Sequence, residues 1–427
     1  MLKEWIVHKE CAEGIELARE LGISPIIGQI LWHRGIGSAD AARAFLHPEN
    51  EAFRDPFLMK DMEKAAQRIL SAVHRGEKIV VYGDYDVDGM TSTALLMKNI
   101  HALGGDVSYY IPNRFTEGYG INLAALQQIA AEGCGLLVTV DCGISSVQPI
   151  QEIHGAMDII VTDHHLPGRE LPAALAVVNP HRADCSYPDK DLAGVGVAFK
   201  LVQAMQMIEK QRVWEDDMDI AALGTISDLV PLVGENRRIV RLGLARMSEN
   251  PCWGVRALIM AAGLEGKKIN TGMVGFQLGP RMNAAGRIET ARRGVDLLLS
   301  EDAQEAECIA GELNALNAER RSLEQDILAE AEAMLVDFTQ DTPAIIAAGE
   351  DWNAGVIGIV ASRLVERYYR PSIVLTRQGD VYKGSCRSIA GLHMYKALEA
   401  CRETLIQFGG HEMAAGLSVA SAQLEEF

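Results

Sequence analysis

KIVVYGDYDVDG, residues Lys78 to Gly89, is the stretch around which the rest of the chain is organised. Its first part, Lys78 to Tyr82, is a short β-branched run that ends at Gly83, and such a run is typical of a buried strand in a parallel sheet. The segment MTSTALLMKNIHAL that follows predicts a helix, with a threonine or serine at positions 91–93 as its N-cap. The stretch therefore predicts a strand, an acidic loop and a helix.

Three carboxylates at alternate positions, Asp84, Asp86 and Asp88, lie just past the predicted strand. Charges crowded in this way repel one another and raise one another's pKa unless a cation holds them. Ligands of open α/β sheets gather outside the carboxyl ends of the strands, so we expect a metal site here. A solvated turn and a calcium loop are the alternatives, but an EF-hand loop needs a glutamate where this chain has Leu95.

The composition describes a soluble protein with a sizeable core. The chain has 427 residues, of which 48% are hydrophobic and 23% charged, enough for two or three domains. No apolar run approaches the roughly 20 residues that span a bilayer, and the charged segment Met1–Glu10 is unlike a signal peptide. The eight cysteines form no CxxC pair, which indicates reduced thiols in a cytoplasm. A net charge of −18 argues against nucleic-acid binding by bulk charge, so any phosphate must be held locally.

Strand and helix patterns alternate between residues 56 and 235, which predicts a doubly wound, mainly parallel sheet of the α/β class. The helical pattern INLAALQQIAAEG separates two of the predicted strands. Besides the strand of the opening stretch, the predicted strands lie at residues 106–112, 136–140, 159–162 and 174–179.

Two later strands end in polar residues as the first one does. Asp141 follows one of them, and Asp163, His164 and His165 follow the next. In a parallel sheet these ends lie along one edge, so we expect the side chains to converge on the acidic loop. Carboxylates with one imidazole suit manganese or magnesium better than a structural zinc. Adjacent histidines on an extended chain point to opposite sides, so one is expected to bind metal and the other to face substrate. Polar residues satisfied on a surface turn are the alternative.

A further acid stands alone in the apolar segment MDIAALGTISDLVPL. This residue, Asp228, is expected to be buried among its apolar neighbours, and a buried carboxylate needs a partner. A metal shared with the earlier acids would be such a partner. The alternative is a capping role beside Pro231.

The segment FQLGPRMNAAGRIETARRG is basic and rich in glycine. Arginines beside small residues allow a phosphate backbone to approach main-chain N–H and guanidinium groups closely. A solvated basic loop that balances the acidic total is the alternative. The arginines of this segment are Arg281, Arg287, Arg292 and Arg293.

The sequence predicts separate structural units at the two ends of the chain. Residues 1–50 contain two short helical patterns, and residues 303–336 form a long helical pattern, about 45 Å if about 30 residues are helical, that is expected to join two domains. A second small α/β unit follows, with Lys383, Ser385 and Arg387 on a predicted strand. In FGGHEMAAG, the glycines suit a phosphate nest, or a tight turn before a helix. The final SAQLEEF predicts the start of another helix.

Taken together, GDYDVDG, VTVDCGISS, VTDHH and GTISDLVPL resemble the four acidic motifs of the DHH phosphoesterase superfamily, in that order. The segments IPNRFTEGYG, LAGVGVAFK, LGPRMNAAGRI, DWNAGVIGIVAS, KGSCRSI and FGGHEMAAG resemble the RecJ branch, whose members are single-strand-specific 5′→3′ DNA exonucleases. Asp84 supports this branch, because smaller DHH phosphatases tend to have histidine at that position. The resemblance implies a DHH domain over residues 51–302, a connecting helix over 303–338 and a DHH-associated domain over 339–427, after an N-terminal helical segment over 1–50.

The resemblance also assigns site residues. It implies a pair of divalent ions, manganese first and magnesium second, with Asp141 as the bridging ligand and with His165, Asp141 and Asp163 as the catalytic set. The implied metal ligands are Asp84, Asp86, Asp88, Asp141, His164 and Asp228. The residues implied to hold the 5′ end of the strand are Arg114, Ser385 and Arg387. Those implied to line the DNA path are Arg281, Asn283, Arg287, Gly409, Gly410 and His411.

The implied activity is hydrolysis of single-stranded DNA from its 5′ end, releasing 5′-mononucleotides for DNA repair and recombination in the cytoplasm. A single-strand-binding protein and a helicase are the implied protein partners. Relatives carry an OB-fold after the second domain, and none fits after Phe427, so either a catalytic core or a short protein is expected. A DHH-type phosphodiesterase of short oligonucleotides or cyclic dinucleotides is the first alternative. A replication scaffold that binds without cutting is the second.

Overall fold

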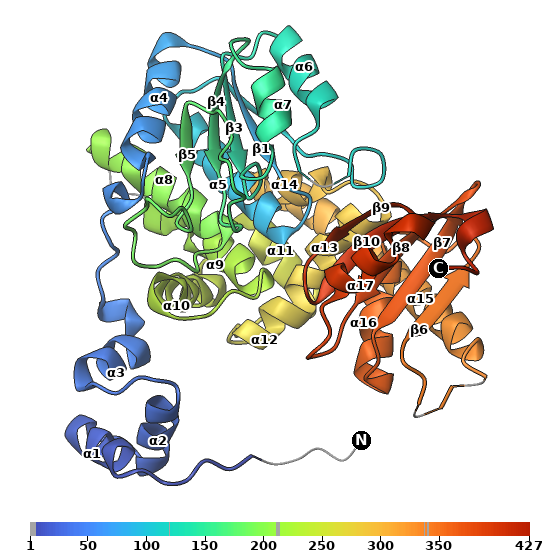
Figure 1. The fold of residues 1–427 in the computed structure, drawn as a ribbon. Coiled ribbons are helices and arrows are strands. Elements are labelled where there is room, and N and C mark those ends of the chain that lie inside the picture. Colours follow the sequence, from blue (N-terminus) through green and yellow to red (C-terminus); the bar gives the residue numbers. More distant parts are fainter. Residues whose placement is uncertain (1–5, 119, 211–213, 337, 340) are drawn as a thin grey trace.

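The computed structural model describes residues 6–118, 120–210, 214–336, 338–339 and 341–427, so Tyr119 of the IPNRFTEGYG motif lies outside the described residues. Two five-stranded sheets organise these residues. Figure 1 shows the first sheet surrounded by helices and the second beside the C-terminus, with the helices α1 to α3 set apart near the N-terminus. The domain boundaries at residues 50, 302 and 338 stay predictions.

The first sheet has the order β2-β1-β3-β4-β5, and every neighbouring pair is parallel. This arrangement confirms the predicted α/β class and places all five carboxyl ends at the same edge. The strands are β1 (Ile79–Gly83), β2 (Val107–Tyr110), β3 (Leu136–Val140), β4 (Asp158–Thr162) and β5 (Ala176–Val178).

Helices cover both faces of this sheet, because side chains that alternate along a strand point to opposite faces. In β1, Ile79 and Val81 join the core on one face, and Val80 and Tyr82 join the core on the other. The first face carries α4 (Met62–Arg75), α5 (Val87–Ala102) and α8 (Gly194–Ile208), and the second carries α6 (Leu123–Ala131) and α7 (Val147–Glu152). The sheet is therefore buried from both sides.

Helix α5 begins earlier than its sequence suggests. Its N-cap is Asp86, whose Oδ1 accepts a hydrogen bond from Gly89 N at 3.1 Å, so the predicted cap at residues 91–93 is wrong. The hydroxyl groups of Thr91 and Thr93 bond back to carbonyls of the preceding turn instead. The acidic loop thus continues directly into the first helical turn, which carries Asp88.

A layer of helices follows the first sheet and includes the basic segment. Its residues form α13 and α14 rather than the loop that the alternative envisaged, since the glycines serve close helix packing. A Cβ on Gly286 would lie 2.7 Å from Tyr85 O, and one on Gly294 would lie 2.1 Å from Met90 Sδ. The elements of the layer are α9 (Met218–Ser227), α10 (Gly234–Glu249), α11 (Trp253–Ala261), α12 (Thr271–Met273), a π-helical turn η4 (Val274–Leu278), α13 (Gly279–Ile288) and α14 (Arg292–Leu299).

The predicted long helix is confirmed as α15 (Ala303–Ala333), with 31 residues. Its first half places Ile309 and Leu313 in the core of the first sheet, and its second half places Ile327 and Leu328 in the core of the second. One continuous helix therefore contributes to two separate cores. This shared packing fixes where the second sheet sits.

The second sheet has the order β6-β7-β8-β10-β9, with only β6 and β7 parallel. Helix α16 (Ile357–Tyr368) packs on one face and α17 (Met394–Ala400) on the other. Cys386 is fully buried in the core under α17. The strands are β6 (Ile345–Gly349), β7 (Ser372–Gln378), β8 (Val381–Arg387), β9 (Leu405–Gly410) and β10 (Ala414–Ala420).

One prediction and one alternative about the C-terminal unit are wrong, while the phosphate nest at FGGHEMAAG stays a prediction. The FGGHEMAAG segment is a β-hairpin, in which His411 N donates to Ala414 O at 2.8 Å, and no helix follows it. SAQLEEF forms only a 3₁₀ turn, η6 (Ser421–Gln423), after which Leu424 and Phe427 pack on the core of the sheet. The helix predicted at SAQLEEF and the helix in the alternative for FGGHEMAAG rested on serine and glycine, which also precede helices. In the structure, β10 pairs antiparallel with β8, so the end of FGGHEMAAG continues as a strand rather than as a helix.

The N-terminal helices form a small unit of their own, with α1 (Ala12–Leu21), α2 (Pro25–His33) and α3 (Ala39–Leu46). The predicted pair corresponds to α2 and α3, whereas α1 was not expected. Arg237 of α10 lies over the ring of Phe45, at 3.6 Å from its centroid, and anchors the unit. Within the part of the chain that the structure describes, none of the helices has the length and apolar character that a membrane span requires. The remaining short turns are η1 (Pro48–Asn50), η2 (Pro56–Leu58), η3 (Trp214–Asp217) and η5 (Arg402–Thr404).

A buried ion pair ties α8 to α10 and to the segment that follows the N-terminal helices. Lys200 is fully buried, and its Nζ donates to Glu235 Oε1 at 3.0 Å and to Arg54 O at 2.6 Å. Glu235 Oε1 also accepts from Arg54 N at 2.8 Å, and Oε2 accepts from the hydroxyl of Tyr187. The buried charges of Lys200 and Glu235 thus compensate each other.

We expect Lys200→Met to lower the free energy of unfolding by about 3 to 5 kcal/mol, because it leaves Glu235 buried without its cation. Urea denaturation followed by circular dichroism measures the change. Lys268→Met, at an exposed lysine, is the control and should change stability little. Equal unfolding midpoints for the two variants would contradict the role of the buried pair.

Candidate metal centre and catalytic site

The polar residues that end three neighbouring strands meet at one edge of the first sheet. Asp84 follows β1, Asp141 follows β3, and Asp163 begins the Asp-His-His triplet after β4. These strands are adjacent in the sheet order, so parallel pairing alone brings their ends together. Asp228, directly after α9, joins them from the helical layer.

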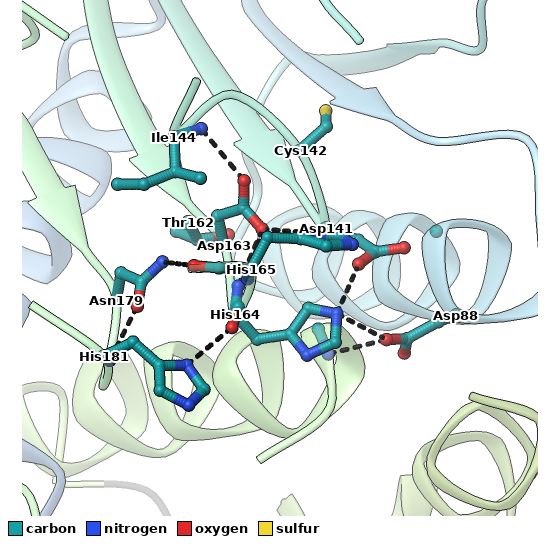
Figure 2. Close-up of polar contacts among 12 residues, drawn as sticks. Asp88, Asp141, Cys142, Ile144, Thr162, Asp163, His164, His165, Asn179 and His181 are labelled. Atoms are coloured by element: carbon teal, nitrogen blue, oxygen red, sulfur yellow. Dashed lines mark hydrogen bonds and ion pairs between the residues drawn. The ribbon is translucent and has the colours of Figure 1, made fainter. Parts of the chain in front are cut away.

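His164 lies at the centre of the carboxylates. Its Nε2 is 3.1 Å from Asp141 Oδ1, 3.7 Å from Asp228 Oδ2 and 3.8 Å from Asp88 Oδ2. Figure 2 shows the imidazole pointing between Asp141 and Asp88. Side chains from distant parts of the sequence therefore share one small volume, as the parallel-sheet argument predicted.

The side chains make up three groups whose ligand atoms lie within 4.8 Å of one another. Asp141 belongs to two of the groups and His164 to two, so the groups adjoin rather than form separate sites. The three groups are Asp84 with Asp86 and Asp141; Asp88 with His164 and Asp228; and Asp141 with His164 and His165.

The donor set fits divalent cations. Among the described residues, one polar atom each on Asp84, Asp141, His164 and Asp228 is buried without a hydrogen-bond partner. Buried polar atoms are normally paired, and carboxylate oxygens with an imidazole nitrogen are ligands that manganese and magnesium accept. The unpaired atoms point into the shared volume, so the residues present fit a metal pair.

The electrostatics of the carboxylates also favours bound cations. Burial, followed by the charge of Asp86, raises the pKa of Asp84 to about 8 and that of Asp228 to about 7. Burial and then Asp228 raise the pKa of Asp88 well above its usual value, and burial and then Asp88 do the same for Asp141. Without cations these carboxylates repel one another, and bound cations would remove the repulsion.

Asp163 holds the second histidine in place. Its Oδ1 accepts from the main-chain N–H of His164 at 2.7 Å and of His165 at 3.0 Å, and it lies 2.7 Å from His165 Nδ1. Oδ2 accepts from Ile144 N at 2.9 Å (Figure 2). Burial opposes the charge of Asp163, yet the hydrogen bond to His165 keeps its pKa below the usual value. Burial lowers the pKa of His165. The hydrogen bond and the charge of Asp163 outweigh burial, so the pKa of His165 lies above its usual value.

The two histidine rings do not point to opposite sides, so that prediction is wrong. Their centroids are 4.4 Å apart, with an angle of 58° between the planes. The backbone is no longer extended at this point, because β4 ends at Thr162 and Asp163 draws both following N–H groups toward its carboxylate. Both imidazoles therefore face the acidic cluster.

Sequence analysis missed two residues that support the histidines. Asn179 Nδ2 donates to His165 O at 2.9 Å, and His181 Nδ1 lies 2.7 Å from His164 O. Both residues closely follow β5 (Figure 2). The signal that could have identified them is the one used for the other strands, namely polar residues just past the carboxyl end.

The N-terminus of α8 donates two hydrogen bonds to Asp88. Gly194 N donates to Asp88 Oδ2 at 2.6 Å and Val195 N donates to Oδ1 at 2.8 Å. A helix N-terminus carries partial positive charge, which suits a buried carboxylate. Gly194 also lies against Asp141, since a Cβ at this position would be 2.7 Å from Asp141 Cβ and Oδ1. The segment LAGVGVAFK thus has a local role that its motif alone did not reveal.

Asp228 is less buried than its apolar neighbours suggested. Its side chain is 23% exposed, and the following Leu229 is 82% exposed with a left-handed φ of 61°. The helix ends at Ser227, so the chain turns outward at this point instead of burying the acid among its neighbours. The exposed side of Asp228 opens the cluster to solvent.

Three arginines lie together beside the acidic cluster, between the two sheets. Arg287 Nη1 donates to Gly355 O at 2.9 Å, and Arg387 Nη1 donates to Ser385 Oγ at 3.1 Å. The guanidinium of Arg114 lies 5.1 Å from the centroid of the Tyr85 ring. Burial, followed by the charge of Arg114, lowers the pKa of Arg287 to about 10, and burial with the same neighbour lowers that of Arg387. Guanidinium groups this crowded favour an anion.

The other sequence-predicted substrate residues are spread more widely. Arg281 donates from Nε to Asn314 Oδ1 at 3.0 Å, and Asn283 Oδ1 accepts from Val87 N at 3.2 Å, so these side chains also hold helices together. Arg293 pairs with Glu312. Gly409 and Gly410 lie in β9, and His411 lies in the adjoining turn. Their contact with substrate stays a prediction.

Known protein families match both units of the chain. The model of the DHH family, N-terminal domain, matches residues 78–225, and the model of the DHHA1 domain matches residues 341–427. The strand-end acids and histidines lie within the first match, and the strands of the second sheet lie within the other. Fold and site thus define a phosphoesterase of the DHH class.

Curated relatives narrow the class. The single-stranded-DNA-specific exonuclease RecJ of Bacillus subtilis is 45% identical over 419 residues, 97% of this chain but only 53% of that protein. The Escherichia coli protein of the same name is 40% identical and covers 98% of this chain, which spans 76% of its length. A crystal structure of exonuclease RecJ bound to manganese, 37% identical, covers 86% of this chain and 92% of its own, with a TM-score of 0.77. The chain therefore belongs to the RecJ family of single-stranded-DNA-specific exonucleases.

We expect Gly194→Ala to weaken divalent-cation binding by about tenfold or more, because the added methyl displaces Asp141 and disturbs the bonds to Asp88. Isothermal titration with manganese measures the affinity without reference to activity. Gly311→Ala is the control, since its Cβ would meet nothing within 4 Å on the exposed side of α15. Equal manganese affinity in the two variants would contradict this positioning role.

Proposed function

We propose that this chain hydrolyses single-stranded DNA from its 5′ end in a metal-dependent reaction and releases 5′-mononucleotides. The observation that carries the proposal is the single volume shared by Asp84, Asp86, Asp88, Asp141, His164 and Asp228, beside a cluster of three arginines. Manganese is the proposed metal and magnesium the second choice, since crystal structures of RecJ from Thermus thermophilus contain Mn²⁺ or Mg²⁺.

Two bound cations would stabilise negative charge on the phosphate oxygens and activate a water molecule. The remaining chemistry belongs to the protein's own residues. Asp141 belongs to two ligand groups, so it would help to hold both cations. Asp163 orients His165 through Nδ1, and His165 would contact the scissile phosphate. Asp163 acts through His165 and is a positioning residue.

Selection of the 5′ end is assigned to the arginine cluster. Arg114, Arg387 and Ser385 would bind the terminal phosphate, and Arg287, which bonds across to Gly355, would stand between this phosphate and the metals. Arg281, Asn283, Gly409, Gly410 and His411 line the proposed path of the strand. Single-strand preference follows if the space between the two units is too narrow for a duplex.

The alternatives predict different substrates. A phosphodiesterase of oligonucleotides or cyclic dinucleotides would prefer substrates of a few nucleotides. A non-catalytic scaffold would leave DNA intact, but such relatives lose metal ligands, and each acidic position is filled here. We further propose a role in DNA repair and recombination in the cytoplasm, with a single-strand-binding protein and a helicase as partners.

Asp141→Ala should abolish digestion of a long single strand, because the two ligand groups then lose the residue they share. The measurement uses strands labelled at one end or the other, with manganese, and Asp106→Ala at an exposed aspartate is the control. Wild-type protein should release label as mononucleotide from the 5′ end only, and a chelator should stop it. Survival of long strands while di- to tetranucleotides disappear would support the oligonucleotide phosphodiesterase instead.

Arg387→Ala should reduce kcat/KM for a 5′-phosphorylated strand by about tenfold to a hundredfold, since a charge-assisted bond to phosphate is lost. The readout is the ratio of rates on 5′-phosphate and 5′-hydroxyl strands. Arg377→Ala, in the same sheet but paired with Glu350 at the surface, is the matched control. Degradation of a circular single strand at the linear rate would refute the terminal-phosphate site.

A further inference from the structure

A cavity of about 460 Å³ continues from the arginine cluster along the second sheet. Its floor is the part of the sheet formed by β8, β10 and β9, and Arg114 and Phe115, from the loop after β2, border it from the other unit. Ser385 stands at the end nearest Arg387. The proposed terminal-phosphate site therefore occupies only one end of the cavity.

Strand register arranges the floor in two rows. The first row consists of Ser385, Gly416 and Gly409, which lie opposite one another on the three strands. The second row, two residues further along, consists of Lys383, Ser418 and Gln407. The rows are about 7 Å apart at the usual rise of a strand. The first row is nearly without side chains, whereas each member of the second can donate a hydrogen bond.

The two glycines keep the cavity open, and the fold does not require them. Neither has a left-handed φ, a Cβ on Gly409 would meet nothing within 4 Å, and one on Gly416 would make only an ordinary contact with Gly384 O at 3.8 Å. Glycine weakens a strand interior and marks places where a ligand approaches the backbone. Larger side chains at these positions would fill the space beside Ser385.

The charge of the lining selects an anion. Acidic residues outnumber basic ones by 58 to 40 in the whole chain, yet among the described residues the cavity is lined by Arg114 and Lys383 and by no carboxylate. Ile357, the first residue of α16, also lines it and brings the positive end of that helix to the wall. A neutral group would leave these charges uncompensated.

We propose that this cavity accepts the additional phosphates of a 5′-triphosphorylated strand. This inference rests on the terminal-phosphate site of the proposed function. The first phosphate lies at Ser385, the chain of phosphates passes over Gly416 and Gly409, and the last phosphate contacts Lys383, Ser418 and Gln407. Arg114 lines the cavity and none of the candidate metal ligands does, so the added phosphates would leave the scissile bond in place.

The reaction balances as ordinary hydrolysis. The oxygen of water bonds to the phosphorus between the first and second nucleotides, the bond from that phosphorus to O3′ of the first nucleotide breaks, and O3′ takes a proton. The first product is therefore a nucleoside triphosphate, and the shortened strand keeps a 5′-monophosphate. Later turnovers release mononucleotides.

The test uses one DNA sequence prepared with a 5′-monophosphate and with a 5′-triphosphate, digested by the whole chain with manganese. We expect one deoxynucleoside triphosphate per triphosphorylated strand, identified by anion-exchange chromatography. If the monophosphate strand is digested and the triphosphate strand is not, or if pyrophosphate leaves first, the inference is wrong and the proposed function stands. If neither strand is digested, the proposed function itself fails.

Two variants test the residues. Lys383→Ala should lower the ratio of triphosphate to monophosphate kcat/KM by about tenfold, because a charged hydrogen bond is lost. Gly416→Val should lower the same ratio by filling the first row, while its thermal midpoint shows that the strand still forms. Lys396→Ala, on α17 at the opposite face of the sheet, is the matched control. An unchanged ratio in Lys383→Ala would overturn the assignment of the second row.

Discussion

Repulsion among buried carboxylates is the constraint on which this structure depends. Asp84, Asp88 and Asp141 are all nearly inaccessible to solvent, and burial raises the pKa of each. A fold can hold such charges only where dipoles and cations oppose them. The protein supplies the N-terminus of α8 to Asp88, and the unpaired ligand atoms of Asp84, Asp141 and Asp228 fit metals for the rest.

The parallel sheet and its helices create the buried setting of these carboxylates. Both faces of the sheet are covered along β1 and β3, so water is excluded from these strands, and the cluster lies at their carboxyl ends. Metal ligands gain strength in such a setting, because few water molecules compete with them. The cluster is also tightly packed. A methyl group at Gly194 would lie 2.7 Å from Asp141, so a small residue is needed at this position.

The second sheet adds selectivity to this chemistry. Helix α15 contributes side chains to both cores, so the arginines of one unit and the strands of the other keep a fixed relation. Cationic groups and open glycine positions then lie on the side of the cluster where the 5′ end of a strand would be held. In a chain of net charge −18, such a local concentration of positive charge would draw a polyanion to one place.

The sequence by itself determined the α/β class, the long helix and the chemical identity of the ligand residues, because strand and helix periods and motif spacing are local properties. Only the tertiary structure decided which atoms meet. It turned the rings of His164 and His165 toward the same cluster, made Asp86 the cap of α5, left Asp228 partly exposed and placed Gly194 against the acids. It also formed the FGGHEMAAG segment into a hairpin by pairing it with β8. The place of Gly194 and the pairing of the hairpin with β8 depend on contacts between segments far apart in the chain, and such contacts leave no period or spacing in the local sequence. The cap at Asp86 and the histidine rings depend on hydrogen bonds between near neighbours, which a strand or helix period does not encode either.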